Sequence, residues 1–157
     1  MSAVDVLTSL QNSFLGQAIG QSNHLVGATA QVFHILGFIF LLAAVIFINL
    51  RLLGLVLPNV PLREVSKQPI QFLWGGFFFA SVSGLLMFIS VPTLYYANPA
   101  FISKLVLYGL AIVFQLALYQ RVLKTEHPSK VLVWVSVALS FFLWFGVGLT
   151  GRAIGYV

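Results

Sequence analysis

The sequence contains no cysteine at any of its 157 positions. This absence excludes disulfide bonds, thiolate nucleophiles, iron–sulfur clusters and covalent haem attachment through a Cys-x-x-Cys-His motif. Acidic side chains are almost as scarce, because Asp5, Glu64 and Glu126 are the only three and none lies in a long apolar run. The apolar runs therefore hold no pair of carboxylates for general acid–base catalysis or for a proton relay.

Charge of either sign is rare, and apolar residues dominate. Charged residues make up 7% of the chain and hydrophobic residues 60%, and the mean hydropathy is +1.02. Soluble domains carry about a quarter of their residues as charges, so we expect lipid to be the main solvent. The net charge is +5, but the basic residues stand at the ends of apolar runs. That distribution predicts membrane topology and argues against nucleic-acid binding.

Four apolar runs are long enough to cross about 30 Å of hydrocarbon as helices. They lie at about 31–57, 70–91, 101–123 and 131–151. Proline-containing breaks separate them, and proline ends helices because it lacks an N–H and clashes with the preceding turn. The sequence therefore predicts an all-α integral membrane protein. Its single domain, residues 31–157, is expected to be a bundle of four transmembrane helices.

Residues 1–30 have a mixed composition. Apolar residues recur there at helical spacing among serine, glutamine and asparagine, which predicts an amphipathic helix at the membrane interface. A disordered tail is the alternative. No lysine or arginine precedes the first apolar run, so the charged region of a secretory signal peptide is missing and we expect the first span to be retained.

Basic residues between the spans predict the orientation, because lysine and arginine concentrate on the cytoplasmic side. The second connection, residues 91–100, carries no charge. The first and third connections are flanked by basic residues: Arg51, Arg63 and Lys67 for the first, Arg121, Lys124 and Lys130 for the third. We therefore expect a multi-pass protein of a bacterial inner (cytoplasmic) membrane with periplasmic N- and C-termini.

Two ionisable residues lie inside the predicted spans. His34 stands about one turn inside the outer end of the first span, and Lys104 about one turn inside the outer end of the third. Both spans run inward, so the two side chains are expected at similar depth, where they could be the axial ligands of one haem iron. Lysine ligates only as a neutral amine, which apolar surroundings favour. The alternatives are a lysine that snorkels to the headgroups and a histidine that bonds a neighbouring helix.

The other two histidines are weaker candidates. His24 lies ten residues before His34 and off its face, and His127 stands beside a proline in a connection. We interpret His24 as a second-choice ligand and His127 as a solvated loop residue.

Further residues share faces with this pair. Tyr108 and Gln115 follow Lys104 at offsets of four and eleven, and Trp144 and Arg152 stand eight residues apart near the end of the fourth span. We expect Tyr108 and Trp144 to line a cofactor. Arg152, at the outer end, could pair with a haem propionate or with a lipid phosphate.

Small residues recur every four positions along the second span, as Gly76, Ala80 and Gly84. That spacing places them on one helix face. Close helix packing explains such a face, and a flat ligand lying against it is the alternative.

Three ordered motifs resemble a family of small bacterial four-helix membrane proteins that has no established activity. They are His-Ile-Leu-Gly at 34–37 with Asn-Leu-Arg-Leu-Leu-Gly-Leu at 49–55, Asn-Pro-Ala-Phe-Ile-Ser-Lys at 98–104, and Leu-Trp-Phe-Gly at 143–146 with Gly-Arg-Ala-Ile-Gly-Tyr at 151–156. The likeness covers most of the chain from about Val32 onward.

A more distant likeness connects the chain with the four-helix type of protoporphyrinogen IX oxidase and with the membrane domain of copper-resistance proteins. In the oxidase family, a histidine in a Phe-His-Ile-like opening of the first span and a lysine opening the third span are implicated in binding haem b. His34 and Lys104 match these positions. Where that family carries a histidine at the end of its third span, this chain has Gln115, Leu118 and Tyr119.

Three functions follow as hypotheses. The first is a membrane protein that holds haem b between His34 and Lys104 and passes electrons to a quinone or to a periplasmic partner. The second is an oxidoreductase of tetrapyrrole synthesis, which the distant resemblance implies. The third is a haem-free accessory subunit of a larger membrane complex. Besides the lipid bilayer, we expect a second copy of the chain or other membrane subunits as partners.

Overall fold

The computed structural model of the chain describes residues 2–21, 24–119, 121–122, 125 and 128–156. Within these ranges the side chains of His24, Leu118 and Tyr119 are not described. Lys124, Glu126 and His127 lie outside the described residues, and with them the interpretation of His127 as a loop histidine. The described part of the chain is helical and contains no strand.

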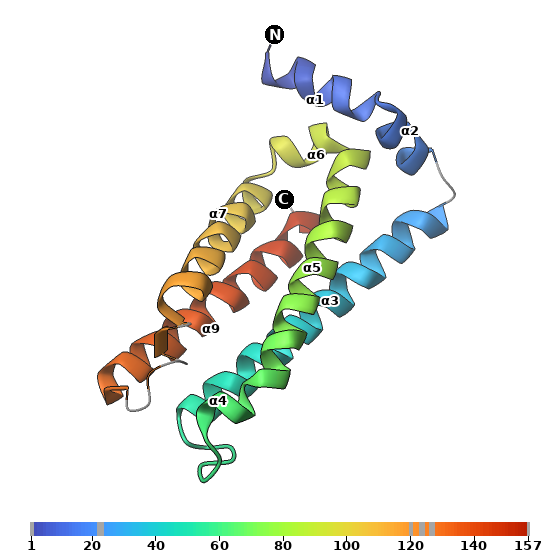
Figure 1. Cartoon of the computed structure of the whole chain (residues 1–157). Helices are drawn as coiled ribbons and strands as arrows, with labels where there is room; N and C mark the ends of the chain where they lie inside the picture. Colours follow the sequence, from blue (N-terminus) through green and yellow to red (C-terminus); the bar gives the residue numbers. More distant parts are fainter. Residues whose placement is uncertain (1, 22–23, 120, 123–124, 126–127, 157) are drawn as a thin grey trace.

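Four long helices form the body of the structure (Figure 1). They are α3 (His24–Leu52), α5 (Lys67–Ser90), α7 (Pro99–Phe114) and α9 (Lys130–Ala153). Among the described residues, the candidate membrane spans are Leu25–Leu52, Leu62–Ser90, Pro99–Ala117 and Lys130–Tyr156. By length and composition these four helices can cross a membrane, which confirms an all-helical chain with four candidate spans.

Short helices join and cover the long ones. They are α1 (Ala3–Gln11), α2 (Phe14–Gly20), α4 (Leu62–Val65), α6 (Pro92–Tyr96), a π-helical turn (Gln115–Tyr119) and a 3₁₀ turn (Ile154–Tyr156). Figure 1 shows α1, α2, α6 and the last turn of α9 at one end of the molecule, which we call the terminal end. The opposite end, where α4 lies, we call the connection end.

The first and third spans depart from the predicted bounds. Helix α3 covers His24–Leu52 rather than 31–57, because no proline or helix stop separates residues 24–30 from the apolar run. It ends before Pro58, because Gly54 and Leu57 take positive φ angles of 74° and 46°, which a helix cannot contain. The third span changes from an α-helix to a π-helical turn at Gln115. Single π turns of this kind often mark functional sites.

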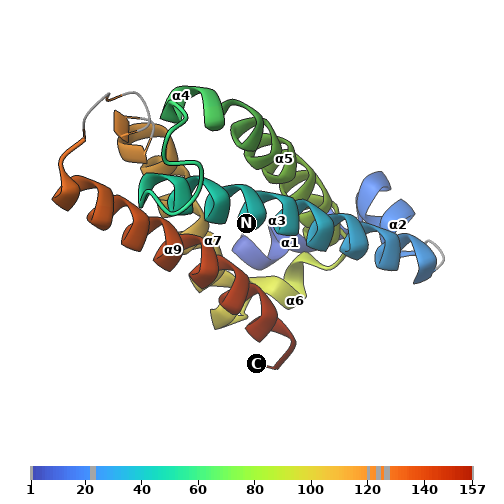
Figure 2. The ribbon, with the colours of Figure 1, turned by 90° about the horizontal axis from the view of Figure 1, so that it is seen from below.

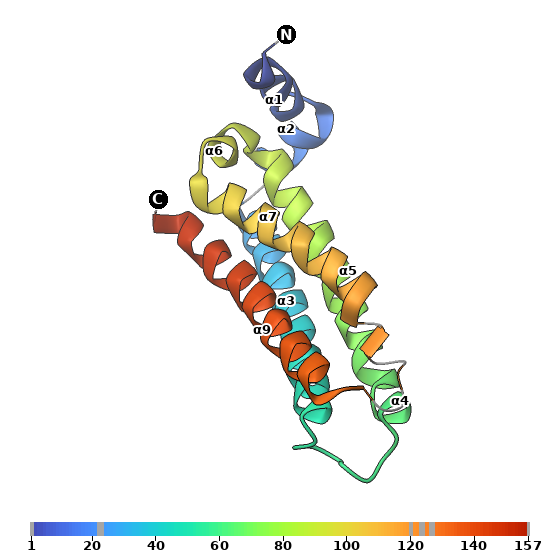
Figure 3. The same cartoon turned by 90° about the vertical axis from the view of Figure 1, so that its left-hand side faces the viewer.

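The long helices pack as two pairs joined through α3. Figure 2 shows α3 lying between α5 and α9, and Figure 3 shows α7 beside α9. The α3–α5 pair is tight because glycines face each other: a Cβ built on Gly76 would lie 2.4 Å from the carbonyl oxygen of Gly37. The buried core between the pairs contains polar side chains and a large apolar cluster. Its members include Leu41, Val45, Ile48, Leu73, Ala111, Phe114, Leu143 and Trp144.

The N-terminal helices lie across the terminal end. Ser2 and Asp5 form a reciprocal capping box that starts α1, and the Ser13 hydroxyl accepts a hydrogen bond from Gly16 N at the start of α2. Helix α1 contacts α6 and helix α2 contacts α5. Helix α1 buries none of its residues, and Phe14 of α2 is 86% exposed. The apolar side chains of α1 and Phe14 of α2 are thus available to a lipid surface.

Candidate functional site

The His34 side chain is bonded to the backbone of α5. Its Nδ1 lies 2.7 Å from the carbonyl oxygen of Ala80, and the Ser83 hydroxyl lies 3.3 Å from the same nitrogen. A carbonyl oxygen only accepts, so Nδ1 carries the hydrogen and donates it. In the neutral imidazole, Nε2 is then left with its lone pair. The tautomer therefore follows from the backbone of a neighbouring span.

Lys104 lies where that lone pair points. Its Nζ is 3.3 Å from Nε2 of His34, with both side chains partly buried. The lysine nitrogen donates to Nε2 in this arrangement. The two ionisable residues that the sequence placed at one depth are thus in direct contact. They come from α3 and α7, seventy positions apart in the chain.

Glycines on the other two spans make room for the pair. A Cβ built on Gly84 of α5 would lie 3.0 Å from Cε1 of His34, and a Cβ on Gly151 of α9 would lie 3.4 Å from Nζ of Lys104. The imidazole and the lysine chain therefore lie directly against helix backbone. All four candidate spans meet at this level of the bundle.

Tyr108 lies one turn toward the connection end from Lys104. Its hydroxyl is hydrogen-bonded to the Ser81 hydroxyl of α5. Its ring stacks on Phe77 with centroids 5.5 Å apart and meets Trp144 edge-on at 6.3 Å. The structure thus brings Tyr108 and Trp144 into contact with each other, one helical turn or more toward the connection end from Lys104. Offset stacked and edge-to-face pairs are the preferred arrangements of aromatic rings.

A second group of polar side chains lies deeper, and of its members the sequence pointed only to Gln115 and Trp144. Asn49 Nδ2 donates to Ser140 Oγ at 3.2 Å, and Trp144 Nε1 donates to Gln115 Oε1 at 3.4 Å. Within the described part of the chain, Gln115 Nε2 and Ser136 Oγ are buried without a hydrogen-bond partner. The signal for Asn49, Ser136 and Ser140 in the sequence is an uncharged polar residue within an apolar run.

Arg152 stands apart from the pair. Its guanidinium lies 4.5 Å above the ring of Tyr156 and donates a hydrogen bond to that residue's hydroxyl. Both side chains are exposed at the terminal end. A position there suits contact with an anionic group at the membrane surface.

The donor set decides which metals the site could hold. Among the described residues, no three His, Cys, Asp or Glu side chains form a group that could hold a metal ion. A zinc site needs three or four protein ligands, so the protein alone offers too few. Two nitrogen donors are the number that a haem iron takes from a protein when both axial positions are filled.

Comparison with known proteins gives one match. Residues 7–157 match the family model described as a family of unknown function, DUF6644. No curated protein and no solved structure matches the chain. The match covers all four candidate spans together with the end of α1 and all of α2.

Proposed function

We propose that this chain, which belongs to the DUF6644 family, is a b-type haem protein of the bacterial inner membrane. In this proposal His34 and Lys104 are the axial ligands of one iron, and the protein transfers electrons to or from a quinone or a periplasmic redox partner. Its termini face the periplasm, as the distribution of basic residues predicts. The likeness to protoporphyrinogen IX oxidase supplies no part of this argument, because no curated protein matches the chain.

One observation carries the proposal: the lone pair of His34 Nε2 points at a second nitrogen donor. Metal-binding histidines characteristically donate their other ring N–H to a carbonyl or carboxylate, which fixes the tautomer and the ring orientation. The 2.7 Å bond from Nδ1 to the Ala80 carbonyl is such a contact. It holds His34 as a ligand-ready imidazole within an apolar bundle.

The two side chains are the residues that would hold the iron, because an imidazole and a neutral amine both offer a nitrogen lone pair. Nε2 of His34 and Nζ of Lys104 are 3.3 Å apart, so the two side chains would have to move apart to admit an iron and the flat ring that carries it. Lys104 has a flexible four-carbon stem that can supply such a movement. Tyr108 follows Lys104 by one helical turn, and its ring meets that of Trp144 edge-on.

The bound haem would supply a one-electron carrier, and the protein would hold it in place and set its surroundings. His34 and the Ala80 carbonyl orient the stronger axial donor. Lys104 gives up its proton to bind, because only the neutral amine has a lone pair. The apolar core around Leu41 and Val45 keeps water away from the connection-end side of the site. Redox potentials of haem depend on ligand identity, burial and outer hydrogen bonds of this kind.

The test is the visible spectrum of the full chain, purified from membranes with added haem. We expect a Soret band and a one-to-one ratio of haem to chain. If no haem with a Soret band stays with the protein after unbound haem has been removed, at any haem concentration, the proposal is refuted. Assay of the same preparation with protoporphyrinogen shows whether an oxidase activity accompanies the haem.

Substitutions distinguish ligation from packing. His34→Ala should abolish or severely weaken haem retention, because the stronger donor is lost. Lys104→Ala should retain haem with a shifted, five-coordinate or water-ligated spectrum. Lys104→Arg should resemble Lys104→Ala, since guanidinium stays protonated and cannot ligate. A wild-type spectrum in Lys104→Arg would reject Lys104 as a ligand, because a snorkelling cation tolerates that exchange. Ser103→Ala, an exposed change on the same helix, is the matched control.

A haem-free accessory subunit is the second candidate, and one observation favours it. Lys104 and His34 already satisfy each other through a direct hydrogen bond, so the pair is complete without a ligand. Large exposed side chains on α5, including Phe72, Phe78 and Phe79, could then pack against other membrane subunits. Co-purification of a partner subunit in stoichiometric amount, without haem, would support this candidate over the first.

A further inference from the structure

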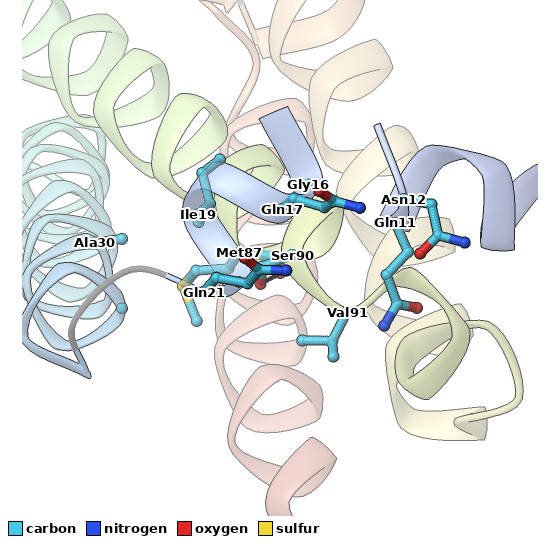
Figure 4. Close-up of a pocket in the computed structure, with 12 residues that line it drawn as sticks. Gln11, Asn12, Gly16, Gln17, Ile19, Gln21, Ala30, Met87, Ser90 and Val91 are labelled. Carbon is cyan, nitrogen blue, oxygen red and sulfur yellow. Dashed lines mark hydrogen bonds between the residues drawn. The ribbon is translucent and has the colours of Figure 1, made fainter. Parts of the chain in front are cut away.

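A cavity of about 420 Å³ lies at the terminal end, between helices from three parts of the chain. Figure 4 shows the side chains of Gln17 and Gln21 beside Met87 and Ser90 of α5, with Ala30 of α3 on the other side. We infer that this cavity binds the ring of a lipid-soluble quinone. The inference deepens the proposed function and rests on it for its redox role.

The location connects the cavity with the His34 site. Ala30 lies four residues before His34, so the two are neighbours on one face of α3, about 6 Å apart along the axis. On α5, Met87 lies three residues after Gly84, against which the imidazole packs. The cavity thus lies about one helical turn from the His34 site, in the direction of the terminal end.

The chemistry of the walls selects a neutral ligand. The polar lining consists of side-chain amides, among them Gln17 and Gln21, together with the hydroxyl of Ser90. None of the described residues that line the cavity carries a charge. A phospholipid headgroup or another phosphate would find no lysine or arginine there to pair with. An amide has both N–H donors and a carbonyl acceptor, so it can bond the carbonyls of a quinone and the hydroxyls of a quinol.

The size and the apolar walls also fit a ring that carries a lipid tail. Binding pockets for small ligands have volumes of about 300–1,000 Å³. Met87 is a flexible, polarizable side chain that makes favourable contacts with the edges of rings, and Ile19 adds an aliphatic wall. An isoprenoid tail could leave toward the exposed apolar surface of α3, where Val26 is 46% exposed.

The walls are fixed by contacts on both sides. Thr93 at the start of α6 donates a hydrogen bond to Gln11 at 3.0 Å, which ties the end of α1 to the terminal end of the bundle. A Cβ on Gly20 would lie 3.4 Å from the carbonyl oxygen of Ser90, so α2 packs close to α5. The cavity is therefore lined mainly by α2, α3 and α5, and the turns at the helix ends contribute Asn12, Gln21 and Val91.

The experiment uses photolabelling of the full chain in lipid nanodiscs with an azido-ubiquinone that carries a decyl tail. We expect labelling in the segments 11–30 and 87–91, with displacement by unlabelled decylubiquinone. Ala30→Phe, which fills the cavity, should reduce this labelling at least tenfold. Ala28→Phe is the matched control, because Ala28 is exposed on the same helix and does not line the cavity. It should label like the wild type.

A second pair of variants covers the case in which Ala30→Phe does not fold. Gln17→Leu/Gln21→Leu changes two exposed amides and should weaken labelling severalfold, whereas Gln31→Leu on α3 should not. Labelling that is spread evenly over lipid-facing helices, or that phosphatidylglycerol displaces and decylubiquinone does not, overturns the inference. Labelling needs no haem. Its loss alongside an intact Soret band therefore rejects only the quinone site, and a missing Soret band rejects only the haem.

Discussion

Replacing one of two adjacent glycines in α5 should destabilise the protein, whereas replacing the other should not. A Cβ on Gly76 would lie 2.4 Å from the Gly37 carbonyl oxygen and 2.7 Å from the Leu41 backbone nitrogen. Ordinary contacts between heavy atoms are about 3.5–4.0 Å, so α3 and α5 must move apart by roughly 1 Å. Both obstacles are backbone atoms, which no rotamer change can move. Overpacking of this kind costs about 1–3 kcal/mol.

Gly75 provides the internal control. A Cβ built there meets nothing within 4 Å, so Gly75→Ala gains about 0.5–1 kcal/mol from helix propensity without a clash. The assay is unfolding of the purified variants in mixed micelles, followed by tryptophan fluorescence. We expect Gly76→Ala to unfold at lower denaturant than the wild type, and Gly75→Ala at equal or higher denaturant. Equal stability of the two variants would refute close packing of α3 against α5.

Two further predictions concern a buried polar contact and the N-terminal cap. Ser140→Ala should cost about 0.5–1.5 kcal/mol, because the buried hydrogen bond from Asn49 Nδ2 to Ser140 Oγ is lost. The exposed change Ser103→Ala should stay within about 0.5 kcal/mol in the same unfolding assay. The pKa of Asp5 is lowered, mainly by a hydrogen bond from the backbone N–H of Ser2 and further by a hydrogen bond from the Ser2 side chain. The cap therefore stabilises α1 fully above the unfolded pKa of about 4, and this stabilisation is lost as pH falls through the lower folded pKa of Asp5. Protection factors for amide exchange in α1, corrected for the intrinsic rate at each pH, should fall on acidification, and unchanged protection factors would contradict this.

The sequence located the candidate site because helix geometry fixes depth. His34 and Lys104 each stand near the start of an apolar run that enters from the same side, and a constant rise per residue brings them to one level. Their contact at 3.3 Å agrees with that reasoning. The common face of Lys104, Tyr108 and Gln115 likewise follows from helical periodicity. The structure agrees with this common face, because Gln115 contacts Trp144 of α9 and Tyr108 contacts Ser81 of α5.

Features that depend on helix rotation could not be predicted in the same way. The pairing of Asn49 with Ser140 requires particular faces of α3 and α9 to meet, and apolar runs that are hydrophobic all round do not show which face is inward. Helix α3 starts at His24, before the apolar run that predicts a span from about residue 31, because polar residues can continue a helix. A helix can extend beyond the hydrocarbon layer, because the thickness of that layer determines only the length of the helix's apolar part.

The small-residue stripe of α5 shows how one pattern can serve two purposes at different depths. At Gly76 the missing side chain lets the α3 backbone approach, so close packing explains that position. At Gly84 the missing side chain admits an imidazole instead of a backbone, since a Cβ there would lie 3.2 Å from Nδ1 of His34. A carbonyl oxygen has two lone pairs, so Ala80 can keep its helical bond and still accept from Nδ1. The same stripe that binds α3 to α5 thus also sets the tautomer of His34, and with it the direction in which Nε2 presents its lone pair.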